Sequence, residues 1–148
     1  MVPAITLVVV TLAARLSGWL GWSYTESWAA ATAVGLAAMF VLTGVAHFAQ
    51  PRRDGLIAIV PPRLPAPGLL VTITGILELL GAVGLLIPST RVVAAASLFF
   101  LMLAMFPANV YAAGAKRSEH APSTPLLPRT VLQVLFLAGA AVVAAGGV

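Results

Sequence analysis

The feature that most constrains the fold is an apolar stretch from Gly68 to Ile87 that carries a single charge, on Glu78. It has about the 20 residues that a helix needs to cross a bilayer. Other stretches repeat this pattern, and 61% of the 148 residues are hydrophobic while only 8% are charged. A soluble domain carries about a quarter charged residues. The sequence therefore predicts an all-α integral membrane protein, a helical bundle forming a single transmembrane domain over residues 1–148.

Charges and prolines set the boundaries of the predicted elements. We expect spanning helices at about 3–22, 28–48, 68–87, 92–113 and 130–147, and a membrane-surface loop at 50–67. Prolines exclude a continuous helix in that loop, although part of it is apolar. Arg15 interrupts the first span near its end, where the side chain can reach the interface. A tilted or interfacial helix is the alternative there, so four and five spans both remain open.

The basic residues predict the orientation, because loops rich in Lys and Arg stay in the cytoplasm. We expect a multi-pass protein of the cytoplasmic membrane, with both long loops in the cytoplasm and, for five spans, the N-terminus there as well. The net charge of +4 reflects this topology and does not indicate a nucleic-acid partner. The residues that carry the signal are Arg52, Arg53, Arg63, Lys116, Arg117 and Arg129.

Several kinds of chemistry find no support in the sequence. The absence of cysteine excludes disulfides and thiolate metal sites. We find no glycine-rich phosphate loop, no paired carboxylates and no nucleophile–base pairing, apart from a weak one between Thr43 and His47 within one helix. We therefore predict no catalytic residue and no metal site, and expect no enzymatic activity from this chain alone.

Glu78 is the first candidate site residue. It lies about ten residues into its span, hence roughly 15 Å deep. A carboxyl group at that depth is costly, and it marks either a proton or ligand site or a hydrogen bond between helices. Thr74 and Gly81 lie one turn before and after it on the same face, and the Thr74 hydroxyl is a candidate donor to the carboxylate. Glycines such as Gly75 and Gly84 predict close helix packing.

Three further polar residues are predicted at a shallower depth on the cytoplasmic side. His47 ends the second span, Asn109 follows Pro107, which breaks the helix or kinks it, and Gln133 lies about one turn into the last span. Together with Glu78 they form a candidate polar funnel with the carboxyl group at its floor. For His47 the alternative is a residue that only caps its helix. The predicted ligand-binding residues are His47, Thr74, Glu78, Asn109 and Gln133.

Four segments follow one another along the chain: Thr43–Phe48, Val60–Pro67, Thr74–Arg91 and Met105–Tyr111. Through these segments, residues 30–145 resemble the DoxX-like family of small bacterial membrane proteins. The resemblance implies a four-helix bundle, to which residues 3–22 add an N-terminal helix. The family takes its name from a subunit of a thiosulfate:quinone oxidoreductase, so the resemblance implies a link to membrane redox complexes and makes quinone the candidate cofactor.

Three functions compete at this point. The first is a quinone-linked subunit that binds a lipophilic molecule and needs a redox partner subunit for its electrons. The second is a binding or transport protein for a lipophilic or cationic compound, with Glu78 as counter-charge and Pro107 as the break in a discontinuous helix. The third is a structural or assembly partner, in which Glu78 only joins helices. The expected partners are the lipid bilayer and either a redox subunit or a second copy of the chain.

Overall fold

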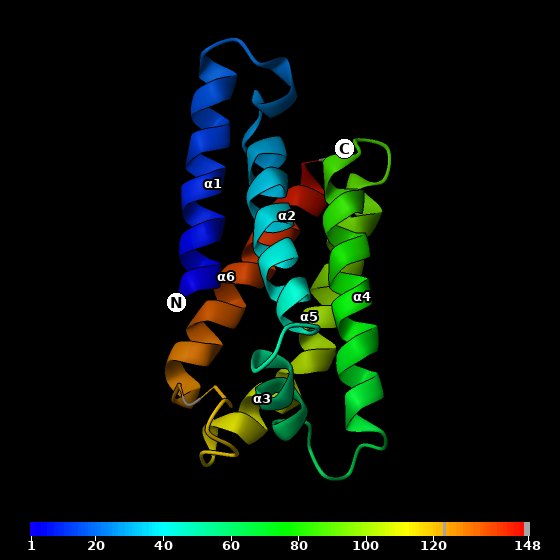
Figure 1. Cartoon of the computed structure of the whole chain (residues 1–148). Helices are drawn as coiled ribbons and strands as arrows, with labels where there is room; N and C mark the ends of the chain where they lie inside the picture. The colour runs from blue at the N-terminus through cyan, green and yellow to red at the C-terminus, as the bar shows by residue number, and fades with distance from the viewer. Residues whose placement is uncertain (123, 147–148) are drawn as a thin grey trace.

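The computed structural model describes residues 1–122 and 124–146, which form six α-helices and one short 3-10 helix (Figure 1). Among these residues, five helices are long and apolar enough to cross a membrane. The elements are α1 (Val2–Trp19), η1 (Ser23–Thr25), α2 (Trp28–Ala46), α3 (Arg52–Ala58), α4 (Pro67–Leu86), α5 (Arg91–Ala113) and α6 (Leu126–Ala145).

The five long helices match the predicted spans closely. The largest difference is at the start of α6, which begins at Leu126 and not at residue 130. Pro128 lies in the first turn of α6, where a proline removes no intrahelical hydrogen bond, so the helix can begin before it. The predicted end at Gly147 lies outside the described residues.

Four of the long helices pack as a closed ring. Helix α2 packs against α4, α4 against α5, α5 against α6, and α6 against α2. Helix α1 lies outside the ring along α2, at the edge of the bundle (Figure 1). The most deeply buried side chains come from all four ring helices and include Leu36, Leu85, Leu98 and Val143. The fold is therefore an all-helical bundle with a four-helix core and a peripheral N-terminal helix.

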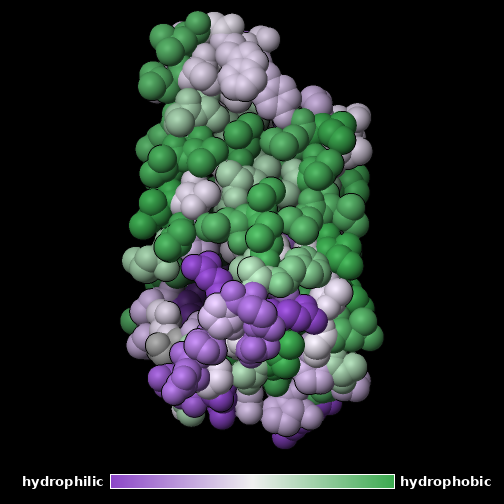
Figure 2. Space-filling view, viewed as in Figure 1, coloured by the Kyte–Doolittle hydropathy of each residue, from purple (hydrophilic) through white to green (hydrophobic). Residues whose placement is uncertain are grey.

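The outer faces of the long helices are apolar. A hydrophobic band crosses the middle of the molecule, and polar residues gather toward the end that carries α3 (Figure 2). Large side chains of α4 and α5, such as Leu80, Val93 and Phe100, are more than half exposed. At the opposite end, the Arg15 guanidinium lies 4.9 Å from the ring centre of Trp19 and 5.5 Å from that of Trp28. Arg15 thus ends among aromatic rings, as expected of a cation near the edge of an apolar span.

The predicted loop at 50–67 differs from expectation, because it contains the short helix α3. Its prolines do exclude a continuous helix, but the residues between Pro51 and Pro61 are long enough for two turns. Arg53 holds α3 against the ends of α2 and α4. One Nη donates to the carbonyl of His47 at 2.7 Å, and the other donates to the carbonyl of Gly68 at 3.1 Å and to the hydroxyl of Thr72 at 3.0 Å.

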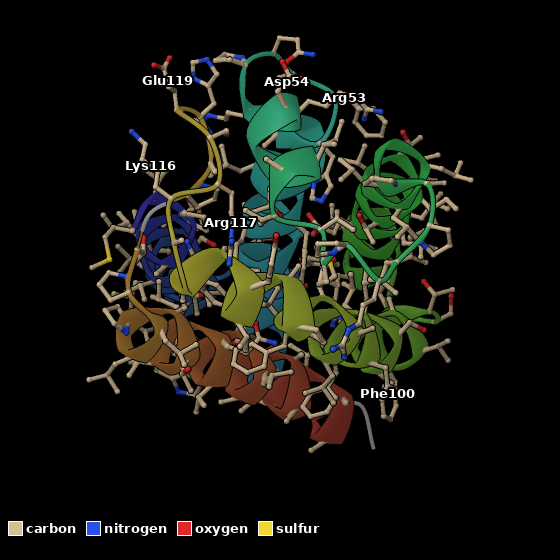
Figure 3. All side chains as sticks on the ribbon, turned by 90° about the horizontal axis from the view of Figure 1, so that it is seen from below. Arg53, Asp54, Phe100, Lys116, Arg117 and Glu119 are labelled. Carbon is tan, nitrogen blue, oxygen red and sulfur yellow. The ribbon has the colours of Figure 1, made fainter. Side chains whose placement is uncertain are left out.

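Both long connections lie at the same end of the bundle, and the last turn of α6 lies near the other end (Figure 1). Gly55 of α3 approaches the α5–α6 connection so closely that an added Cβ would meet the backbone of His120. Ile59 packs there with Ala112 and Ala121 in a small second core. Figure 3 views this end from below and shows its charged side chains, Arg53, Asp54, Lys116, Arg117 and Glu119.

Candidate functional site: a polar cluster beside an apolar pocket

Glu78 belongs to a polar cluster between α2 and α4. The hydroxyl of Thr43 donates to Oε2 of Glu78 at 2.5 Å. His47, one turn further along α2, places Nδ1 3.9 Å from the same oxygen. Both His47 and Glu78 are only 4% exposed. The buried carboxyl group therefore meets a hydroxyl and an imidazole from the neighbouring helix.

The prediction that Thr74 donates to Glu78 is wrong. The Thr74 hydroxyl lies 2.9 Å from the carbonyl oxygen of Leu70 and 3.1 Å from that of Val71, so its hydrogen is used within α4. A threonine in a helix commonly finds these carbonyls of the preceding turn. The donor to Glu78 comes instead from Thr43. The sequence carried a signal for this, because Thr43 and His47 are four residues apart and share a helix face.

Two glycines allow α2 and α4 to approach so closely. A Cβ added to Gly44 would lie 2.9 Å from Cδ2 of Leu79. A Cβ added to Gly75 would lie 2.5 Å from Cβ of His47 and 2.9 Å from Cε2 of Phe48. Small residues at such crossings let helix backbones come together. The close packing predicted for Gly75 is confirmed, and it is what brings the α2 side chains to Glu78.

A pocket of about 580 Å³ lies beside this cluster. One wall is formed by α4 from Leu70 to Thr74, and the other by α5 from Leu101 to Ala108. Helix α3 and the proline-rich segment after it close one end. The lining is apolar except for His47, Thr74 and Arg63, and Glu78 lies behind His47, outside the lining. An apolar cavity with a few polar groups is typical of small-molecule sites.

Asn109 does not contact the Glu78 cluster and is instead hydrogen-bonded to Arg129 of α6. Its side-chain oxygen accepts a hydrogen bond from Nη1 of Arg129 at 3.1 Å. The same guanidinium donates to the carbonyl of Thr124 at 2.6 Å and to that of Pro122 at 2.7 Å. Arg129 is only 8% exposed, and it fixes the α5–α6 connection. The sequence predicts Arg129 to be a loop cation, and in the structure it is instead buried, which hydropathy does not indicate.

Gln133 also serves the α5–α6 pair. Its side-chain nitrogen donates to the carbonyl of Met102 on α5 at 2.8 Å. The predicted polar funnel is therefore divided: His47, Thr74 and Glu78 lie together at the α2–α4 side, while Asn109 and Gln133 join α5 to α6. Helix α5 continues through Pro107 to Ala113, so the break considered for a transport site does not occur.

Residues 36–144 match the protein family described as a domain of unknown function, DUF8561. The chain belongs to this family. The matched region runs from within α2 to within α6, so it holds the polar cluster and the pocket and leaves α1 outside. No curated protein and no solved structure matches the chain.

In the described part of the matched DUF8561 region, one group of side chains can take part in proton transfer or in hydrogen bonding to a ligand. An imidazole lies at the wall of an apolar pocket, and a buried carboxyl group lies directly behind it. Both groups can hold or release a proton, and the imidazole can also exchange a hydrogen bond with a bound molecule. Among residues 1–122 and 124–146, no three metal-ligating side chains gather as a metal site would require. The pocket beside His47 combines an apolar lining with a few polar side chains, as sites for organic ligands do.

Proposed function

We propose that this DUF8561 member is a multi-pass membrane protein that binds a lipophilic molecule of the quinone class in the pocket beside His47. The observation that carries the proposal is the pocket itself, which is almost entirely apolar and has an imidazole in its wall. Several lining residues, among them Leu64, Ala104 and Pro107, are exposed on the outside of the bundle. A ligand dissolved in the bilayer could therefore enter between α4 and α5 without crossing water.

The proposal includes a DoxX-like core and an orientation. The closed ring of α2, α4, α5 and α6 with α1 outside supports the core. Basic residues of α3 and of the α5–α6 connection share one end of the bundle, which supports a cytoplasmic position for that end (Figure 3). The apolar band between the ends supports embedding in a bilayer, because lipid requires an apolar outer surface.

In this function the chain supplies binding and proton handling, and a partner subunit supplies electrons. Reduction of a quinone to its quinol needs two electrons and two protons at the ring oxygens. His47 lies where it can meet a ring oxygen, and Glu78 lies 3.9 Å behind Nδ1 as a second proton-holding group. Proton transfer by positioned side chains of this kind is a common contribution of proteins to such steps.

A structural role for Glu78 is the second candidate, and one observation favours it. The hydrogen bond from Thr43 to Glu78 joins α2 to α4, which is what a polar contact that stabilises a membrane bundle does. In that case Glu78 would hold the helices together, and the pocket beside it would have no need of the carboxyl group.

The test is ligand binding by the purified protein in mild detergent. Co-purifying lipophilic molecules are identified by mass spectrometry, and the affinity for a short-chain quinol, the reduced member of the quinone class, is measured by calorimetry. The hydroxyl groups of a quinol can both donate and accept hydrogen bonds. We expect His47→Leu to weaken quinol binding about tenfold or more, the value of a hydrogen bond inside an apolar site. His120→Leu is the matched control, since His120 is exposed in the α5–α6 connection.

Two outcomes would decide between the candidates. Equal quinol affinity in the wild-type chain and in His47→Leu would contradict the proposed site. A Glu78→Gln variant that melts at a lower temperature yet binds quinol as the wild-type chain does would assign Glu78 to the structural role alone.

A further inference from the structure

The two ring nitrogens of His47 have different surroundings. Nδ1 lies 2.8 Å from the carbonyl oxygen of Thr43, one turn earlier on α2. A backbone carbonyl can only accept a hydrogen bond, so Nδ1 must carry the hydrogen. A neutral imidazole has one N–H group, and Nε2 then presents a lone pair. In this state the imidazole can offer its remaining nitrogen only as an acceptor.

The neighbours of His47 favour this neutral form and this orientation. The Arg53 guanidinium is bound to the carbonyl of His47 at 2.7 Å, and a cation so near disfavours a second positive charge on the ring. Oε2 of Glu78 accepts from Thr43 and lies 3.9 Å from Nδ1, beyond hydrogen-bonding distance, so it does not compete for the Nδ1 hydrogen. Gly75 lets the base of the imidazole lie against the α4 backbone.

Thr74, the second polar residue that lines the pocket, also has an acceptor but no free donor. The Thr74 hydroxyl hydrogen is directed to carbonyls of its own helix, which leaves the Thr74 oxygen as an acceptor. No described residue donates a hydrogen bond to Nε2 of His47. The remaining polar lining residue, Arg63, is a donor, but it is exposed on the proline-rich segment at the end of the pocket.

We infer that the pocket selects a ligand that donates a hydroxyl group, a phenol or a quinol, over a ring that offers only a carbonyl or an ether oxygen. The inference rests on the proposed function, because it names the chemical form that the same pocket prefers. Two residues that line the apolar cavity, His47 and Thr74, each keep an acceptor for which no described residue is a donor. Burying these acceptors against a ligand without a donor leaves both unsatisfied. For a quinone–quinol pair, the reduced form is then the one that the pocket holds.

The experiment compares two ligands that differ in one hydrogen-bond donor. The affinities of an alkylphenol and of its methyl ether are measured by calorimetry on the full chain in lipid nanodiscs. We expect the phenol to bind at least about tenfold more tightly, because the ether cannot satisfy the acceptors. The comparison needs no variant to fold, and neither ligand undergoes redox chemistry.

A substitution of His47 then tests whether this residue causes the preference for the phenol over the ether. His47→Phe keeps an aromatic side chain but removes the acceptor, and we expect it to bind the phenol and the ether alike. His120→Phe is the control and should keep the wild-type preference. Equal or tighter binding of the ether by the wild-type chain would overturn the inference and leave the pocket as a lipophilic site. Failure of both ligands and of the quinol to bind would overturn the proposed function as well.

Discussion

The helix pairs α2–α4 and α5–α6 both bury polar side chains, and they use them in different ways. In the α5–α6 pair, Arg129 and Gln133 direct their hydrogens to oxygens of the protein, mostly backbone carbonyls. In the α2–α4 pair, Thr43 satisfies one oxygen of Glu78, while His47 uses one ring nitrogen and keeps the other beside a pocket.

This difference separates two reasons for placing polar groups in an apolar bundle. A side chain whose hydrogen bonds all end within the protein stabilises the arrangement that supplies its partners. A side chain beside a cavity that has a donor or acceptor without a protein partner can form a hydrogen bond with a ligand there. Substitutions on the α5–α6 side should therefore affect stability alone, and substitutions around His47 should affect binding.

The largest effect is expected from Arg129→Ala. It removes three hydrogen bonds and leaves the carbonyls of Pro122 and Thr124 and the Asn109 oxygen without their donor. Hydrogen bonds to a charged group contribute about 1.5–3 kcal/mol each, so we expect a loss of at least roughly 3 kcal/mol. Thermal unfolding in detergent measures it.

Arg129→Lys is the matched comparison, because lysine keeps the charge but cannot span three acceptors with a planar fork. The unfolding free energy of Arg129→Lys should lie between those of the wild-type chain and Arg129→Ala. If the protein that remains folded in either variant has lost its quinol affinity, the separation between a stabilising side and a binding side is wrong.

The Thr43–Glu78 contact gives the next effect. Thr43→Val removes the donor and leaves a buried carboxyl oxygen unsatisfied, which costs roughly 1–3 kcal/mol. Replacing both partners, as Thr43→Val with Glu78→Leu, should recover most of that loss, since no orphaned acceptor remains. A double-mutant cycle on unfolding free energies measures the coupling. A coupling near zero would mean that this bond does not hold α2 to α4.

Gly75→Ala adds only one methyl group, but we expect it to weaken ligand binding clearly. An added Cβ would lie 2.5 Å from Cβ of His47, so the imidazole must move. Overpacking of this kind costs typically 1–3 kcal/mol, and displacement of the ring should weaken quinol binding about tenfold. Gly139→Ala is the control, because the nearest side-chain atom there is an ordinary 3.6 Å away. Equal binding by these two variants would show that the position of the imidazole does not matter.

The sequence predicted the helices well and their partners poorly, for a physical reason. Spanning helices follow from the length and hydropathy of local stretches, so α1, α2, α4 and α5 lie close to their predicted ranges. Which helix faces which depends on packing between distant segments. Glu78 was identified as a site, but its partner was sought on its own helix at Thr74 and is Thr43 on α2.

Depth in the membrane was likewise insufficient to predict a shared site. His47, Asn109 and Gln133 were grouped because they lie at similar distances from the helix ends. In the folded chain Asn109 is bonded to Arg129 of α6 and Gln133 to the Met102 carbonyl of α5, while His47 lines the pocket, so equal depth does not bring these side chains together. The burial of Arg129 and the position of α3 under the pocket follow from loop packing, which hydropathy does not encode.

The smallest effect is expected from Gln133→Leu. This variant tests whether the polar side chains between α5 and α6 affect stability without affecting binding. The change removes one neutral hydrogen bond, to the Met102 carbonyl, and places an apolar side chain of similar size in an apolar setting. We expect a loss of about 1 kcal/mol in unfolding free energy and an unchanged quinol affinity. His47→Leu also removes one hydrogen bond, to the Thr43 carbonyl, so its loss in unfolding free energy should be similar, but it should clearly weaken quinol binding. If Gln133→Leu weakens binding as much as His47→Leu does, then Gln133 belongs to the ligand site and the single polar funnel expected from the sequence is the better description.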